Sequence, residues 1–324
     1  MIDPAGRIVD YLRISVTDRC NERCLYCMPE HYSAWLPRAD LLTYDEILAI
    51  ARIGVRLGFK HFRVTGGEPL LRPGIVDLIA SLVRTPGVQS VDMTTNATRL
   101  PQLARPLHDA GLRRINISLD ALDPALYHAI TGGDLAPVLE GLRAVKALGF
   151  ESIKLNTVLI RGRNDGQILP LVHFAAAQDV AIRFIELMPI SFTEMLDESN
   201  FLSAAEAGRM IAAEDEMVPL DAVLGFGPAR YFKLQRTGAV VGLISALTDL
   251  HFCDRCNKMR LTADGRLRPC LGNHLETNLI PALRPALDES ALEALIRSTL
   301  AGKPAEHLFR DNYQPGRIMT AIGG

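Results

Sequence analysis

Between residue 8 and about residue 188, runs of β-forming residues alternate with amphipathic stretches six times in succession. Six consecutive units of this kind imply a parallel sheet with right-handed crossovers. Because six units are too few for a complete eight-stranded barrel, the pattern leaves a partial barrel or an open doubly wound sheet. In both architectures the active-site residues gather at the C-terminal ends of the strands.

Capping and turn residues place the boundaries of these elements. Thr43 followed by Glu46 forms a capping box at the start of one helix, and Gly58 ends that helix. The pattern predicts strands over 11–16, 61–65, 88–94, 114–119, 152–159 and 182–187, and helices over 44–57, 74–84, 100–110, 135–148 and 167–178. Beyond Pro189 the alternation stops: residues 190–228 are mixed, 231–234 and 240–244 resemble a hairpin, and helices are expected over 279–287 and 291–300.

The composition excludes several classes of function. The chain has 324 residues, of which 48% are hydrophobic, and its longest apolar runs are too short to span a membrane. A net charge of −2 gives no bulk electrostatic case for binding nucleic acid. The first residues, Met1-Ile2-Asp3-Pro4, do not resemble a secretory signal, so we expect a cytoplasmic location.

Three cysteines, Cys20, Cys24 and Cys27, follow the first predicted strand with the spacing C-x3-C-x2-C. A cubane iron–sulfur cluster is usually held by four cysteines, so three thiolates from one loop leave one iron open for another ligand. A structural zinc site would need a fourth ligand, for which His31 is the local candidate.

The other three cysteines, Cys253, Cys256 and Cys270, form a second triad with the spacing C-x2-C-x13-C. A disulfide framework suits short secreted chains, so metal binding is favoured in a chain of this length. Two separate metal centres are therefore expected. Here too a zinc site is an alternative, completed by His251 or His274.

The turn Gly66-Gly67-Glu68-Pro69 directly follows the second predicted strand. Its glycines allow close approach of the backbone to a ligand, and Glu68 offers a carboxylate for an ammonium group. Together with the first cysteine triad, this turn resembles the radical S-adenosylmethionine superfamily. In that superfamily the open iron binds the amino and carboxylate groups of S-adenosylmethionine, and the cleaved cofactor abstracts a hydrogen atom from the substrate.

The second triad, the segment around Lys258-Met259-Arg260 and the Gly323-Gly324 end are similar to the GTP 3′,8-cyclase family of molybdenum cofactor biosynthesis. The resemblance covers nearly the whole chain and is weakest over 190–228. It implies cyclisation of GTP to 3′,8-cyclo-7,8-dihydro-GTP with two 4Fe–4S clusters and S-adenosylmethionine. It also implies a homodimer, an external one-electron donor and transfer of the product to the next biosynthetic enzyme.

The same resemblance implies a role for individual residues. It places the cluster ligands at Cys20, Cys24, Cys27, Cys253, Cys256 and Cys270. It places S-adenosylmethionine contacts at Tyr26, Gly67, Glu68, Ser118 and Met188. It places GTP contacts at Arg13, Arg63, Thr94, Lys154, Lys258, Met259 and Arg260, and catalytic positions at Arg260, Gly323 and Gly324.

Two positions depart from the family pattern. Lys258 stands where the family commonly has arginine, which keeps the charge but loses the planar fork. Ala97 follows Thr94-Thr95-Asn96 where the family has glycine, so a positive φ at Ala97 would be strained.

Two other functions fit parts of the pattern. Peptide-modifying relatives also carry auxiliary clusters, generally with more cysteines, and the basic pair after Cys256 and the di-glycine end argue against that class. A non-catalytic zinc protein would use both triads as structural modules.

We therefore expect an α/β fold: a partial TIM-type barrel of about six βα units with a smaller C-terminal cluster-binding α+β region. The expected division is a radical S-adenosylmethionine domain over 1–228 and an auxiliary-cluster and GTP-binding region over 229–324.

Overall fold

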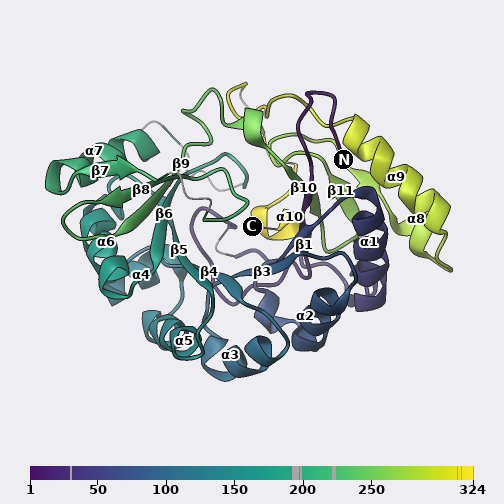
Figure 1. The fold of residues 1–324 in the computed structure, drawn as a ribbon, viewed down its shortest axis with the longest axis horizontal. Helices are drawn as coiled ribbons and strands as arrows, with labels where there is room; N and C mark the ends of the chain where they lie inside the picture. The colour runs from purple at the N-terminus through teal and green to yellow at the C-terminus, as the bar shows by residue number, and fades with distance from the viewer. Residues whose placement is uncertain are drawn as a thin grey trace.

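The computed structural model describes residues 1–29, 31–191, 197, 199–220, 224–311, 313–314 and 316–323. One curved sheet of 12 strands, in the order β12-β11-β10-β1-β2-β3-β4-β5-β6-β9-β8-β7, forms the centre of the molecule. Its two ends do not meet, so the barrel is partial, and most of the helices cover its convex side (Figure 1). The predicted α/β partial-barrel fold is confirmed.

The parallel part of the sheet is wider than six strands. β1 to β6 run parallel in chain order, and β10 and β9 extend them as parallel neighbours of β1 and β6. The strands are β1 (Tyr11–Ser15), β2 (His61–Thr65), β3 (Ser90–Thr95), β4 (Arg114–Ser118), β5 (Ser152–Leu159), β6 (Ala181–Glu186), β7 (Met217–Pro219), β8 (Arg230–Leu234), β9 (Val240–Ile244), β10 (Lys258–Leu261), β11 (Arg266–Arg268) and β12 (Thr277–Asn278).

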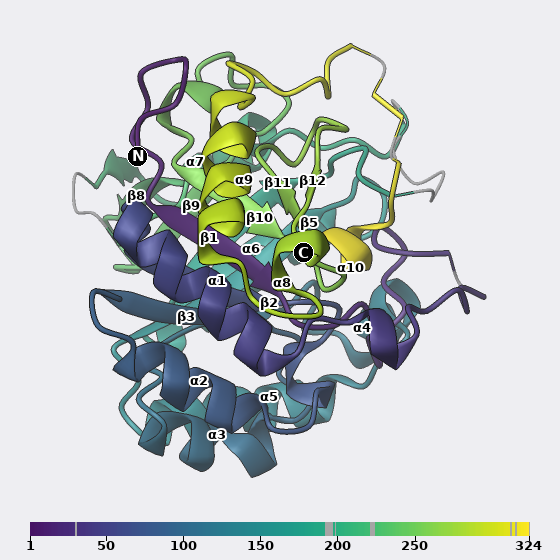
Figure 2. The same cartoon turned by 90° about the vertical axis from the view of Figure 1, so that its right-hand side faces the viewer.

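Ten α-helices are found in the described part of the chain. They are α1 (Tyr44–Leu57), α2 (Ile75–Arg84), α3 (Leu100–Asp109), α4 (Pro124–Thr131), α5 (Leu135–Ala147), α6 (Ile168–Ala177), α7 (Ala204–Glu214), α8 (Ile280–Leu283), α9 (Glu289–Ala301) and α10 (Met319–Ile322). The Thr43–Glu46 capping box begins α1 as predicted. The helix α9 lies beside α1 on the outer surface (Figure 2), whereas α10 lies near the centre of the partial barrel (Figure 1).

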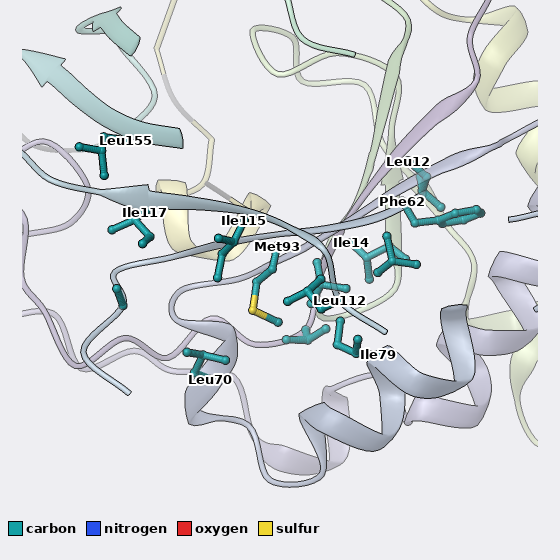
Figure 3. Packing of buried hydrophobic residues seen from close by; sticks show 14 of the residues in the cluster. Leu12, Ile14, Phe62, Leu70, Ile79, Met93, Leu112, Ile115, Ile117 and Leu155 are labelled. Carbon is teal, nitrogen blue, oxygen red and sulfur yellow. The ribbon is translucent and has the colours of Figure 1, made fainter. Parts of the chain in front are cut away.

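The core fills the space between the sheet and its outer helices. Leu12, Phe62 and Met93 lie on neighbouring strands and Ile79 lies on α2, and all four are fully buried (Figure 3). Burial of each large apolar side chain stabilises the fold by roughly 2 kcal/mol. The outward-facing side chains of the strands therefore pack against the helices. The inward-facing side chains line the concave side of the sheet.

The predicted strands and most helices are confirmed to within about two residues, and the hairpin is present as β8 and β9. The long helix expected over 279–287 is wrong, because α8 covers only Ile280–Leu283 and Pro285 follows. The helices α4 and α7 were not predicted. No described helix is long and apolar enough to cross a membrane.

Strands beyond residue 228 join the same sheet as those before it, because β10 pairs with β1 and β9 pairs with β6. The division into domains at residue 228 stays a prediction.

Candidate functional site

A cavity of about 340 Å³ lies on the concave side of the sheet and is lined by residues of both cysteine triads. The two triads lie at opposite ends of the paired strands β1 and β10: the first follows the C-terminal end of β1, whereas Cys256 precedes the N-terminal end of β10, which runs parallel to β1. The predicted residues that line the cavity are Arg13, Cys20, Cys24, Tyr26, Cys27, Arg63, Gly67, Glu68, Thr94, Ser118, Met188, Cys253, Cys256, Lys258, Arg260 and Cys270.

The first triad has acidic surroundings. All three thiols are free, and burial is the main cause of a raised pKa at each, to about 12 for Cys27. The carboxylates of Glu22, Glu68 and Asp120 add to this rise. Burial also raises the pKa of Glu68 to about 7 and that of Asp120 to about 6.

The glycine turn is pressed against the cysteine loop. A Cβ on Gly67 would lie 2.2 Å from the Arg19 carbonyl oxygen, and one on Gly66 would lie 2.6 Å from that of Thr17. The Gly67 N–H donates to the Thr17 carbonyl at 2.6 Å. No side chain fits at Gly67, so glycine there fixes the position of the cysteine loop as well as lining the cavity.

Glu68 is buried and held in place by its neighbours. Its carboxylate accepts hydrogen bonds from Leu70 N at 2.9 Å, Thr95 Oγ1 at 2.7 Å and Asn96 N at 2.7 Å. Beyond the end of β4, the Tyr26 hydroxyl donates to Asp120 Oδ2 at 2.6 Å. These bonds orient both side chains, and the S-adenosylmethionine contacts assigned to them stay predictions.

The second triad has basic surroundings. Lys303 Nζ lies 3.5 Å from Cys256 Sγ and donates to the Lys258 and Pro269 carbonyls, and Arg7 donates to the Cys253 carbonyl at 2.9 Å. Burial alone would raise the pKa of Cys256, but Lys303 and Lys258 outweigh it, and the pKa is lowered. Burial raises the pKa of Cys253 and Cys270.

Basic side chains line the cavity between the two triads. Arg63 is fixed by Asp92 at 2.7 Å and by Tyr11 and Thr94. Burial lowers the pKa of Lys258 to about 7 and that of Arg260 to about 10. These shifts mark a site in which positive charges are crowded together and kept from water, as a polyanion would require.

Two of the predicted GTP contacts, Lys154 and Met259, do not line this cavity. Lys154 Nζ donates to the Leu224 carbonyl and lines a neighbouring cavity of about 350 Å³ near the start of β5. Met259 is fully buried in the main core, because it alternates with Lys258 and Arg260 along β10. Gly324 lies outside the described residues.

The end of the chain reaches Arg260. The Gly323 carbonyl accepts a hydrogen bond from Arg260 Nη1 at 2.6 Å, and Gly323 has a φ of +79°. A Cβ there would lie 3.1 Å from Ser15 and 3.2 Å from Thr65. Both the conformation and the tight space therefore favour glycine at this position.

Sequence reasoning missed two basic residues. Arg183, on β6, lines the cavity and donates to Asn156 Oδ1 at 2.8 Å. A charged residue between the apolar Ile182 and Phe184 of a predicted strand was the available signal. Lys303 had no such signal, because it lies far from the triads in the sequence.

Each triad supplies three free thiols. Within the described ranges, no three His, Cys, Asp or Glu side chains converge in a way that would hold one metal ion. Thiolates are the usual ligands of iron–sulfur clusters, so the donor chemistry of both triads fits such clusters.

Comparison with known proteins agrees with this geometry. The Radical SAM superfamily model matches residues 14–175, and the Molybdenum Cofactor Synthesis C model matches residues 180–309. GTP 3′,8-cyclase of Petrotoga mobilis is 39% identical over 325 residues, which cover 100% of each chain. GTP 3′,8-cyclase 1 of Pseudomonas aeruginosa is 45% identical over 100% of this chain and 99% of that one. The chain belongs to the GTP 3′,8-cyclase family.

Two solved structures of more distant proteins have a similar fold. Streptococcus suis SuiB bound to its precursor peptide SuiA has a TM-score of 0.61 and 16% identity, over 98% of this chain and 76% of that chain. Native anSMEcpe with bound AdoMet has a TM-score of 0.60 and 15% identity, over 92% of this chain and 82% of that chain. In this chain, the region that each family model matches contains one cysteine triad.

Proposed function

We propose that this protein is a radical S-adenosylmethionine enzyme that cyclises GTP to (8S)-3′,8-cyclo-7,8-dihydroguanosine 5′-triphosphate, the first step of molybdenum cofactor biosynthesis. The observation that carries the proposal is the similarity to GTP 3′,8-cyclases over the full chain. A single cavity lined by both cysteine triads and by arginine and lysine side chains supports it.

The first triad would hold one 4Fe–4S cluster and, with Tyr26, Ser118 and Met188, the S-adenosylmethionine beside it. When bound, this pair supplies one-electron cleavage of the cofactor and hence the hydrogen abstraction that starts cyclisation. The chain's own part is to fix the cofactor against the substrate. The contact between Gly67 and the loop at Arg19 makes the position of the thiols rigid.

Arg13, Arg63, Arg183 and Lys258 would bind the triphosphate. Because Asp92 and Tyr11 already hold the Arg63 guanidinium, little side-chain entropy is lost when it binds phosphate. The second triad would hold the other 4Fe–4S cluster and, with Arg260 and the Gly323 carbonyl, the guanosine end of the substrate.

An apolar cover would keep water from the reacting atoms. Ile190, Phe309 and Tyr313 form a second buried cluster, against which Met188, Leu271 and Met319 pack. Most of these side chains also line the cavity. Exclusion of water protects a reactive organic radical and strengthens the electrostatic contacts around it.

Several properties rest on the family resemblance alone. We infer a homodimer, a cytoplasmic location, an external one-electron donor and transfer of the product to the next enzyme of the pathway. The division at residue 228 and the roles of Glu68, Thr94, Lys154, Met259 and Gly324 belong to the same inference.

The test uses anaerobically purified protein, dithionite, S-adenosylmethionine and GTP. Mass spectrometry should find the cyclised nucleotide, and 5′-deoxyadenosine should form only when GTP is present. Cofactor cleavage that ignores GTP and gives no cyclised product would defeat the proposal. Metal analysis should give roughly four irons per cluster, whereas a colourless protein rich in zinc would support a structural role.

A further inference from the structure

The C-terminal segment 317–323 is attached at both ends to the hairpin formed by β10 and β11. At one end, Arg317 Nη1 lies 3.1 and 3.0 Å from the two carboxylate oxygens of Asp264, in the turn of that hairpin. At the other end, Arg260 of β10 binds the Gly323 carbonyl at 2.6 Å. The hairpin therefore sets the distance between the two ends of the segment.

A second carboxylate strengthens the attachment at Arg317. Glu276 lies 3.1 Å from Arg317 Nη2 and 2.9 Å from Arg268 Nη1. Arg268 on β11 is the register partner of Arg260 on β10. Arg317 is thus joined, through Glu276 and one pair of strand residues, to the arginine that binds the end of the chain.

The residues between these two points are buried against the cavity. Ile318, Thr320 and Ile322 are at most 3% exposed, and Met319 and Thr320 line the cavity. The Met319 N–H lies 3.4 Å from Ser191 Oγ, and the Ser191 hydroxyl donates to the Cys27 carbonyl. A shift at Arg317 would therefore move residues that contact both the cavity and the first cysteine loop.

We propose that Arg317 is a positioning residue for cyclisation: its ion pair with Asp264 holds the chain end so that the Gly323 carbonyl meets Arg260. Arg317 does not line the cavity, so it acts through the segment that follows it. This inference rests on the proposed function. The pair is partly exposed, with side chains 24% and 14% accessible, so its loss moves the segment more than it lowers the stability of the fold.

The experiment compares Arg317→Ala and Arg317→Lys with a matched control, Arg161→Ala. Arg161 also pairs with a carboxylate, that of Glu206 at 2.9 and 2.6 Å, but does not line the cavity. For Arg317→Ala we expect the kcat for cyclised product to fall at least tenfold with the KM for S-adenosylmethionine unchanged. Arg317→Lys should recover part of the rate, and Arg161→Ala should match the wild type.

A second measurement does not depend on activity. Carboxypeptidase digestion followed by mass spectrometry should remove the last residues of Arg317→Ala at least several times faster than those of the wild type and of Arg161→Ala. Equal trimming of Arg317→Ala and wild type, or an unchanged kcat in Arg317→Ala, would overturn the positioning role. A wild-type protein that makes no cyclised product would instead defeat the proposed function, while the trimming still tests the attachment.

Discussion

The two cysteine triads line one cavity and supply the same number of thiols, but carboxyl groups surround the first and amino groups lie beside the second. Glu22, Glu68 and Asp120 surround the first triad, whereas Lys303 and Lys258 lie beside the second. Negative charge near a cluster disfavours its reduced form, and positive charge favours it. The contrast suits a first cluster that gives up an electron and a second that sits beside an anionic nucleotide.

The strongest test of this division is removal of one ligand from each triad. Cys24→Ala should abolish cofactor cleavage and cyclised product, with a loss of more than about a thousandfold, because we assign the cleavage chemistry to the first cluster. Cys270→Ala should abolish cyclised product but leave binding of S-adenosylmethionine measurable. Iron analysis and equilibrium dialysis with labelled cofactor distinguish the two variants. Equal loss of cofactor binding in both would break the comparison.

The next test changes the charge beside the second triad. Lys303 is 3% exposed and donates to the Lys258 and Pro269 carbonyls, so Lys303→Met should lower the free energy of unfolding by roughly 2–4 kcal/mol. Removal of the cation should also lower the reduction potential of the second cluster and leave that of the first unchanged. A redox titration followed by electron paramagnetic resonance, with Lys303→Arg as the control, measures both. A shift of the first cluster instead would contradict the assignment.

A smaller effect is expected from the pH dependence of Lys154. Burial, followed by Arg183 and Arg114, lowers its pKa to about 7, so the amine is mostly neutral above pH 7 in the free protein and charged below it. If the triphosphate contacts Lys154, its negative charge raises this pKa, and binding at pH 8 should take up roughly one additional proton. Affinity for GTP should therefore increase as the pH falls from 9 to 7.

Calorimetry in buffers with different ionisation enthalpies measures that proton uptake. Lys154→Arg should bind GTP without the additional proton, because its guanidinium stays charged throughout this range. Proton uptake that is equal in Lys154→Arg and wild type would show that Lys154 does not respond to the nucleotide.

The part of the site that sequence predicted follows from local pattern. The periodicity of 11–16 and 61–65 placed two strands, and parallel strands expose their C-terminal ends at one edge, so the first triad and the Gly66-Gly67 turn had to meet. Thiol spacing and the glycine turn are visible without any tertiary information. In the structure, Gly67 does pack against the cysteine loop at Arg19.

What escaped prediction depends on contacts between distant parts of the chain. Arg317 pairs with Asp264, and Arg7 binds the Cys253 carbonyl 246 residues away, and no periodicity encodes either contact. Lys154 shares the inner face of β5 with Asn156 and Val158 but lies nearer the start of that strand, so it lines a different cavity. Assignment of a strand predicts on which face of the sheet a side chain lies. Its position along the barrel axis depends on the register of the whole sheet.

The smallest predicted effect concerns Ala97, behind the first triad. Ala97 is fully buried with a φ of 66°, a conformation that costs a non-glycine residue about 1 kcal/mol. Ala97→Gly relieves that strain but loses a buried methyl group worth about 0.8 kcal/mol, so the free energy of unfolding should change by less than about 1 kcal/mol. The control Ala104→Gly, at a buried position in α3, gains no such relief and should be clearly destabilised. Urea denaturation of both variants measures the difference. An Ala97→Gly loss as large as that of Ala104→Gly would show that Ala97 carries no strain, and that the backbone holding Asn96 N against Glu68 is relaxed.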